Sequence, residues 1–410
     1  MNKIEIMAPA GSWESLHTSL NAGADSVYFG LEYLNMRARA SNNFNLENLN
    51  KIVALCNKHS AASYVTLNTV IYDNDITLMH KICDACIKEG VTAIIASDLS
   101  VITYAHSIGL EVHLSTQANI SNTEAVRFYS QYADVVVLAR ELSLEQIKTI
   151  SSQIKEQNIR GPKGNLIRLE LFVHGALCVG ISGKCYMSLA QYNYSANRGA
   201  CLQACRRRYK VIEEETGQEL ILDNQYIMSP KDLCTITVLD QIVASGVVVL
   251  KIEGRGRSPE YVHTVIKTYR DALDSISKDE YTTEKIETWK KQLESVYNRG
   301  FWQGGYYLGH QLGEWTNSYG SQSTTKKEYI GKITNYFSDL NVAEIKLETG
   351  SLTVKDKILI IGPTTGVLEE STISIHTDKP VEAAYKGELC AIKVASKVRR
   401  NDKIYKILKK

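Results

Sequence analysis

The sequence predicts an α/β protein built on a (β/α)8 TIM-like barrel, and three observations favour this fold class. Eight short runs rich in β-branched residues occur in the first two thirds of the chain. Segments with helical, three-and-four apolar periodicity separate these runs. No G-x-G-x-x-G follows the first run, which weakens the alternative of a doubly wound open sheet that binds a dinucleotide.

The elements follow in a regular order. The expected strands are Ile4–Ala8, Ser26–Phe29, Tyr64–Asn68, Ala93–Ser97, Glu111–Ser115, Asp134–Leu138, Arg168–Val173 and Val247–Ile252. The expected helices between them include Trp13–Ala22, Leu46–Lys58, Thr77–Lys88, Thr123–Tyr132 and Leu144–Gln157. In the second helix, Leu49, Ile52, Val53 and Cys56 recur on one face, which predicts that this face packs on the barrel.

The regular alternation breaks once, between the seventh and the eighth strand. There the stretch at about 175–246 replaces a single crossover helix, and we expect it to emerge at the C-terminal rim of the barrel. The predicted barrel domain is 1–280, followed by a helix and an aromatic, glycine-rich connecting segment at 281–326. Six short alternating runs between turns predict a small antiparallel β-barrel domain at 327–410.

Composition and charge bound the class of protein. Hydrophobic residues make up 44% of the chain and charged residues 22%, as in globular proteins. No apolar run is long enough to span a membrane, and the first residues lack the apolar core of a signal peptide, so we expect a cytoplasmic protein without a membrane partner. The formal net charge of +2 means that any nucleic-acid contact must come from local patches.

Four of the nine cysteines gather in the insertion, in a C-x6-C pair followed by a C-x3-C pair. They are Cys178, Cys185, Cys201 and Cys205. Clustered thiols in a reducing compartment indicate metal ligands before disulfides. The wide first spacing favours an iron–sulfur cluster over a zinc knuckle, while zinc and unliganded thiols stay open as alternatives. Cys234 is an alternative fourth ligand, although its expected place at a helix start favours a buried thiol.

Polar residues follow most of the expected strands, at the rim where barrel enzymes have their sites. They include Asn68, Asp98, Gln117, Asn119, Arg140, Glu141, His174, Lys251, Glu253 and Arg255. Any one of them is consistent with a helix cap, but together they predict a polar pocket. A competing interpretation pairs His174 with Cys178 as the thiolate and imidazole of a cysteine hydrolase.

Several motifs resemble those of one family. ELFVHGALCVGISGKCYMS resembles the signature of the collagenase-like peptidases, family 32 of the U class, and APAG, LSTQANISN, NRGACLQACRRRY and KIEGRGRSPEYV are also similar to it. The resemblance implies an enzyme related to members implicated in the prephenate-dependent 5-hydroxylation of the wobble uridine of tRNA. Related members hydroxylate a cytidine of ribosomal RNA. It further implies a 4Fe–4S cluster on the four clustered cysteines, with the downstream Cys234 as an alternative fourth ligand.

The resemblance gives the polar residues provisional roles in such a reaction. Amide groups of Asn68, Gln117 and Asn119 would read the edge of a splayed uridine, and Tyr209 or Tyr186 would stack on it. Cations would meet the carboxylates of prephenate; the candidates are Arg140, Lys251 and Arg255, with Arg198 in reserve. The candidate catalytic groups are Glu141, His174 and Glu253. The run Arg206, Arg207 and Arg208 would contact tRNA phosphates, with the small β-domain as a second RNA surface.

Two other functions remain as alternatives. One is a collagenase-like peptidase with a cysteine- or metal-based centre, and the other is an RNA-binding scaffold whose cluster is structural. A paralogous partner chain or a homo-oligomer is also compatible with the sequence.

Overall fold

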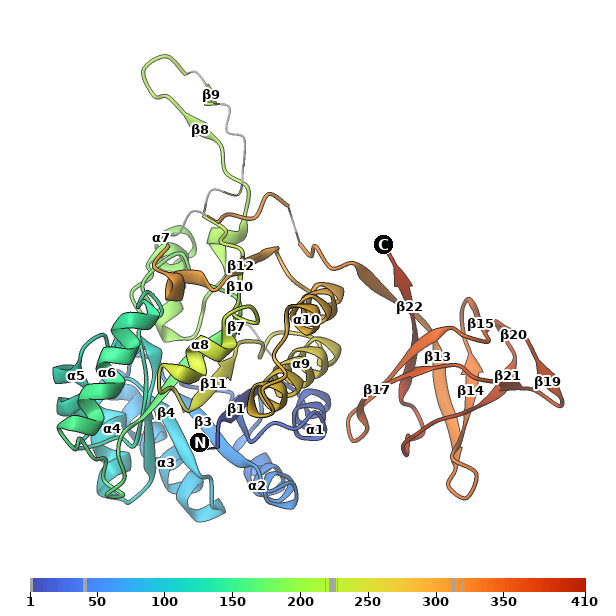
Figure 1. Cartoon of the computed structure of the whole chain (residues 1–410), viewed down its shortest axis with the longest axis horizontal. Coiled ribbons are helices and arrows are strands. Elements are labelled where there is room, and N and C mark those ends of the chain that lie inside the picture. Colours follow the sequence, from blue (N-terminus) through green and yellow to red (C-terminus); the bar gives the residue numbers. More distant parts are fainter. Residues whose placement is uncertain are drawn as a thin grey trace.

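A closed parallel barrel forms the larger part of the computed structural model, which describes residues 3–39, 43–217, 219–220, 226, 228–310, 314–318 and 320–410 (Figure 1). Its strands are β1 Glu5–Ala10, β2 Ser26–Gly30, β3 Ala62–Leu67, β4 Ala93–Ala96, β5 Glu111–Leu114, β6 Val135–Val137, β7 Arg168–Gly175 and β11 Val249–Ile252. Each strand pairs in parallel with the next, and β11 pairs with both β7 and β1, which closes the barrel. The predicted fold class is confirmed, and each expected strand end lies within two residues of the observed one.

Helices cover the outside of the barrel. They are α1 Trp13–Asn21, α2 Leu49–Lys58, α3 Ile76–Glu89, α4 Leu99–Ser107, α5 Thr123–Tyr129, α6 Leu144–Glu156, α8 Leu239–Ala244 and α9 Pro259–Ser277. The apolar face expected for α2 is the buried one. The main core lies between helices and strands, and a smaller core that includes Met7, Tyr28 and Val249 fills the inside of the barrel.

The insertion between β7 and β11 adds structure to one end of the barrel. It contains α7 Met187–Tyr192, short 3₁₀ turns at Ala196–Arg198 and Ala204–Arg206, β8 Val211–Ile212, β9 Glu219–Leu220 and β10 Asp232–Cys234. β8 and β9 project away from the barrel (Figure 1). β10 pairs antiparallel with β7 and parallel with β12 Phe301–Gln303, so the insertion extends the barrel sheet. Cys234 therefore lies in a strand, and its expected place at a helix start is wrong.

A helix and a connecting segment lead to the C-terminal unit. α10 Thr283–Ser295 packs on α9, and β12 and a 3₁₀ turn at Gly305–Leu308 follow. The C-terminal strands are β13 Thr325–Phe337, β14 Val342–Leu347, β15 Ser351–Thr353, β16 Lys357–Gly362, β17 Gly366–Ser371, β18 Ile375–His376, β19 Pro380–Val381, β20 Ala383–Tyr385, β21 Leu389–Lys393 and β22 Lys403–Lys409.

These strands form antiparallel sheets around a core of their own. The larger sheet has the order β17-β16-β22-β13-β14-β21-β18-β19, and β15 pairs with β20. β17 packs against α1, and Lys327 Nζ lies 2.8 Å from Glu260 Oε1 on α9. These contacts join the C-terminal unit to the barrel. Within the described ranges, no helix combines the length and the apolar character needed to cross a membrane.

Candidate functional site

The four clustered cysteines line one cavity at the C-terminal end of the barrel. This cysteine cavity has a volume of about 170 Å³, and segments that follow β2, β6, β7 and β11 form its walls together with the insertion. All four cysteines are free thiols, with Cys178 exposed and the other three partly buried. Among the described residues, no three His, Cys, Asp or Glu side chains converge closely enough to hold a single metal ion. The structure thus brings the four predicted cysteines together at one cavity.

Two glycines hold the cysteine-bearing loops against the rim. Gly199 has φ +87°, and a Cβ there would lie 2.5 Å from Asn35 O, so only glycine allows this approach. The N–H of Arg39 donates to Gly199 O at 3.2 Å, which fixes the loop before Cys201 to the segment after β2. On the other side, Gly183 packs directly on Gln117 in the loop after β5. The two cysteine pairs are therefore anchored to different parts of one rim.

Arginines dominate the charge of the cysteine cavity. The guanidinium groups that line it belong to Arg37, Arg140, Arg206, Arg257 and Arg299. Glu253 is the carboxylate among the described lining residues, and Arg37 Nη2 lies 2.9 Å from its Oε1. Burial alone would raise the pKa of Glu253, but the charges of Arg37, Arg257 and other arginines outweigh it and lower that pKa. Glu253 is accordingly an ionised counter-charge at neutral pH, and the cavity as a whole attracts anions.

Asp232 on β10 holds two of these arginines from behind. It is almost fully buried, and its Oδ1 accepts a hydrogen bond from Arg299 Nε at 3.0 Å and another from Nη2 of the same residue. Arg257 Nη2 lies 3.8 Å from Asp232 Oδ2, and its guanidinium lies 3.8 Å from the centre of the Tyr297 ring. Because β10 belongs to the barrel sheet, these contacts fix the arginines rigidly beside the cysteines.

Arg206 is used inside the protein rather than on its surface. It donates to Ser229 Oγ at 3.2 Å, to Pro230 O at 3.0 Å and to Leu177 O. These bonds tie three segments together next to Cys205. A phosphate contact by Arg206, as the basic run suggested, would have to break them.

Arg207 and Arg208 are exposed, unlike Arg206. Arg207 lies over the Tyr192 ring at 4.8 Å, and Arg208 Nε donates to Tyr226 Oη at 2.6 Å. Tyr209 donates to Ala204 O at 2.8 Å, while the side chain of Tyr186 faces solvent. Of the residues predicted to contact RNA, Arg207, Arg208 and Tyr186 are therefore exposed to a large ligand.

The three amide side chains predicted to read a base form one network at the rim. Asn68 Nδ2 donates to Gln117 Oε1 at 2.6 Å, and Gln117 Nε2 donates to Asn68 O at 2.6 Å. Asn119, in a left-handed conformation, donates to Ser182 O at 3.0 Å. The structure brings the three together, but none of them is among the described residues that line the cysteine cavity. Asn68 and Gln117 thus join two loops of the barrel, and Asn119 attaches the insertion to it.

Two of the predicted cations lie deeper, inside the barrel. Lys251 Nζ lies 2.7 Å from Glu170 Oε1, and Arg255 Nη1 donates to Thr66 Oγ1 at 2.9 Å. Burial lowers the pKa of Lys251 and lowers that of Arg255 to about 10. Of the three proposed prephenate ligands, Arg140 is the one that reaches the cysteine cavity. Its guanidinium lies 4.2 Å from the Phe172 ring centre, and its Nε is buried without a hydrogen-bond partner in the described structure.

Four other candidates lie outside the cavity lining. Arg198 is bound to Asp75 and lies over Tyr72, and Glu141 is exposed. His174 is buried against Tyr261, Tyr269 and Phe301, and burial lowers its pKa to about 4. Cys234 is fully buried, and burial raises the pKa of its thiol to about 12. His174 and Cys178 therefore do not form the pair that a cysteine hydrolase needs, and Cys234 does not face the other four thiols.

Sequence reasoning missed three of the cavity arginines and Asp232. Arg37 follows β2, and Arg299 precedes β12, so neither stands at a predicted strand end. Arg257 lies in the KIEGRGRSPEYV motif, which was a usable signal because two arginines there follow a barrel strand.

The model of peptidase family U32 matches residues 11–317. The chain belongs to peptidase family U32. All described lining residues of the cysteine cavity, from Met36 to Arg299, fall within the matched stretch, whereas the C-terminal sheets lie outside it.

The U32 relatives carry different names. The chain is 54% identical over 411 residues to a protein of Porphyromonas gingivalis named collagenase, covering 100% of this chain and 99% of the relative. It is 30% identical over 387 residues to the tRNA hydroxylation protein P1 of Bacillus subtilis, and the match covers 92% of this chain and 86% of that protein. It is 33% identical over 279 residues to the 23S rRNA 5-hydroxycytidine C2501 synthase of Escherichia coli, covering 68% of this chain and 40% of that longer protein.

Proposed function

We propose that this U32 protein hydroxylates a pyrimidine of RNA, and specifically C5 of the wobble uridine of tRNA, with a 4Fe–4S cluster and prephenate as co-substrate. The observation that supports this most is the convergence of four free thiols and five arginines on one cavity at the mouth of a barrel. RNA-hydroxylating relatives with 30% and 33% identity support the same reaction class.

The donor set fits an iron–sulfur cluster. Cys178, Cys185, Cys201 and Cys205 supply four soft ligands, which is the number that a 4Fe–4S cluster takes. Burial raises the pKa of the Cys205 thiol, Arg206 opposes this, and the charges of the other three cysteines raise that pKa further, as expected if they lie close to Cys205. Such a cluster, when bound, supplies one-electron transfer.

The cavity charge fits an anionic co-substrate. The family resemblance assigns prephenate to this hydroxylation as the co-substrate. Prephenate is a dianion, and the unpartnered Nε of Arg140 is a buried donor that a carboxylate would satisfy. Arg257 and Arg299, held by Asp232, add fixed positive charge on the same cavity. In this proposal Glu253 orients arginines and does not transfer protons.

A peptidase is the second candidate, because a relative with 54% identity is named collagenase. The geometry supports it less well. His174 is sealed among aromatic rings and largely neutral. Cys178 would have to act without an imidazole partner.

Nucleoside mass spectrometry of tRNA tests the proposal. Cells that lack the gene are complemented with the wild type, with Cys201→Ala or with Cys390→Ala, a buried cysteine of the C-terminal core. We expect 5-hydroxyuridine with the wild type and with Cys390→Ala, and none with Cys201→Ala. Full restoration by Cys201→Ala would refute the cluster-dependent reaction. Gelatin hydrolysis that survives Cys201→Ala and is lost in Cys178→Ala would establish the peptidase instead.

A further inference from the structure

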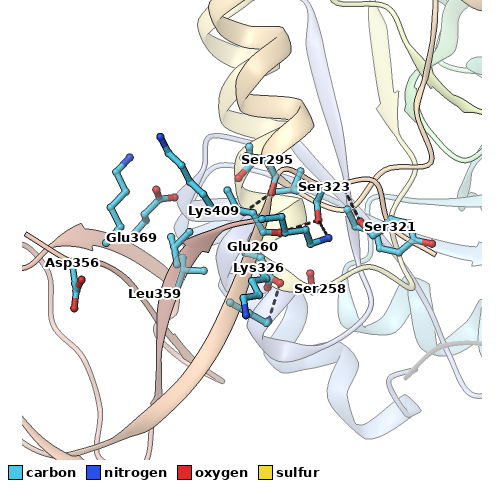
Figure 2. Close-up of a pocket in the computed structure, with 18 of the residues that line it drawn as sticks. Ser258, Glu260, Ser295, Ser321, Ser323, Lys326, Asp356, Leu359, Glu369 and Lys409 are labelled. Atoms are coloured by element: carbon cyan, nitrogen blue, oxygen red, sulfur yellow. Dashed lines mark hydrogen bonds and ion pairs between the residues drawn. The ribbon is translucent and has the colours of Figure 1, made fainter. Parts of the chain in front are cut away.

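A cavity larger than the cysteine cavity lies between the barrel and the C-terminal unit. This interdomain groove has a volume of about 600 Å³ and runs between the start of α9, the end of α10 and strands β13, β16 and β22 (Figure 2). Six lysines line it, namely Lys326, Lys327, Lys355, Lys357, Lys409 and Lys410. Three carboxylates face them, Glu260, Asp356 and Glu369, so the formal charge of the lining is 6 − 3 = +3.

Two of the carboxylates in the groove are already paired. Glu260 Oε1 lies 2.8 Å from Lys327 Nζ, and Asp356 Oδ2 lies 2.6 Å from Lys406 Nζ, outside the lining. Lys355, Lys357 and Lys409 are exposed and form no ion pair with any described residue. The positive charge of the groove is therefore available to a ligand rather than consumed by neighbours.

The groove continues along α9, so it is long. An adjoining cavity of about 760 Å³ shares Lys357, Glu369 and Lys409 with the first. It adds the exposed Lys267 of α9 and Lys291 of α10, together with the carboxylates of Asp271 and Glu370, so the extension lengthens the groove without changing its net charge. Lysines spread along an extended channel suit a ligand with regularly spaced negative charges better than one small anion.

The groove also reaches the wall of the cysteine cavity. Tyr297 lines the groove, and Arg257, which lines the cysteine cavity, lies 3.8 Å from the centre of its ring. Ser258, the residue after Arg257, lines the groove as well. The groove and the cysteine cavity therefore have the Arg257–Tyr297 contact as a common wall.

From this placement we infer that the interdomain groove binds the phosphate backbone of the RNA whose base enters the cysteine cavity. The inference rests on the proposed RNA hydroxylation and adds a second contact surface. Its side on α9 and α10 lies within the stretch matched by the U32 family model, and its side on the C-terminal strands lies outside that stretch. Lysine ammonium groups bind phosphates as point charges and do not read sequence, so the groove contributes affinity and direction rather than choice of base.

Salt-dependent binding of labelled tRNA, measured by fluorescence anisotropy, tests the groove. The test variant is Lys355→Gln/Lys357→Gln/Lys409→Gln. The matched control, Lys379→Gln/Lys386→Gln/Lys393→Gln, removes the same charge from exposed positions of the same unit outside the groove. We expect the test variant to bind roughly tenfold more weakly and to lower the slope of log affinity against log salt by about 2, while the control stays near the wild type. Equal behaviour of the two triple variants would overturn the inference.

A gain of binding excludes loss of folding as the explanation. Glu369 is exposed on β17 and lines both the interdomain groove and the cavity that adjoins it. Glu369→Gln should therefore tighten tRNA binding and steepen the slope of log affinity against log salt. Unchanged or weaker binding by Glu369→Gln would contradict the inference. The inference would also be contradicted if inorganic phosphate or AMP displaced the labelled tRNA as well as unlabelled tRNA does at the same concentration of phosphate groups. The groove would then bind a small anion.

The two proposals can fail separately. If the gene is required for 5-hydroxyuridine but the groove variant binds tRNA like the control, only the groove inference is wrong. If the wild type neither binds tRNA nor supports 5-hydroxyuridine, the proposed function is wrong.

Discussion

The buried ion pair between Glu170 and Lys251 allows a quantitative test of the barrel interior. Lys251 Nζ lies 2.7 Å from Glu170 Oε1, and the two side chains are 6% and 0% exposed. Burial lowers the pKa of Lys251 and the charge of Glu170 opposes this, so the ammonium depends on its partner to stay charged. Glu170 Oε2 has no hydrogen-bond partner in the described structure, so the carboxylate also depends on Lys251.

The cost of breaking this pair can be worked out from its burial. Lys251→Met keeps most of the side chain and removes the charge, which leaves a carboxylate buried beside apolar atoms. Removal of one partner of a buried pair typically costs about 3–5 kcal/mol. Protonation sets a ceiling, because neutralising a glutamate with a pKa of about 4.3 at pH 7 costs about 3.7 kcal/mol. We therefore expect Lys251→Met to lower the free energy of unfolding by about 3–4 kcal/mol.

The double variant Lys251→Met/Glu170→Leu removes both charges. We expect its free energy of unfolding to lie within about 1–2 kcal/mol of that of the wild type. Urea unfolding at pH 7, followed by circular dichroism, measures all variants. Arg127→Met is the control, because its pair with Glu124 is exposed and should contribute less than about 1 kcal/mol. The reasoning is refuted if Lys251→Met costs no more than the control, or if the double variant is less stable than Lys251→Met.

Three further results are expected. Burial alone would raise the pKa of Glu111, but His113 and Lys163 outweigh this effect and lower that pKa to about 2. Glu111→Gln should therefore lower the free energy of unfolding by about 3 kcal/mol at pH 7. In urea unfolding experiments, the difference in stability between this variant and the wild type should shrink as the pH falls from about 4.5 towards 2. A difference that does not change with pH would contradict this expectation. Gly199→Ala should abolish iron binding, measured as iron per chain, because its Cβ would strike Asn35 O; Gly217→Ala, also at positive φ but with no atom within 4 Å, should bind iron normally. Cys234→Ala should leave the iron content unchanged, since that thiol packs in the core, and a loss equal to that of Cys205→Ala would show that Cys234 is a ligand.

The barrel could be predicted from sequence because its strands are short, buried on both faces and separated by amphipathic helices. Each of these properties leaves a local pattern, as in the helix from Leu49 to Lys58. The strand at Asp232–Cys234 left no such pattern, since it is three residues long and is defined by its pairing with β7 and β12. That pairing, which sequence does not reveal, turns Cys234 away from the cysteine cavity.

The candidate site was predictable where residue type alone decides the chemistry. Four cysteines have few uses together in a reducing compartment, and they do meet at one cavity. Arginines were harder, because a guanidinium has many partners within reach. Arg198 is bound to Asp75, and Arg206 donates to carbonyls beside Cys205, whereas Arg37 and Arg299 arrive from distant segments. Tertiary packing decides which partner each arginine contacts. The sequence therefore shows that a positive charge is present but not where it lies in the folded protein.

Iron and acid-labile sulfide analysis of the protein purified and reconstituted without oxygen tests the central claim most directly. We predict about four iron atoms and about four sulfides per chain for the wild type. We further predict that both fall together in Cys178→Ala, Cys185→Ala, Cys201→Ala and Cys205→Ala. A single zinc ion per chain, or an iron content that none of these four substitutions changes, would contradict the account.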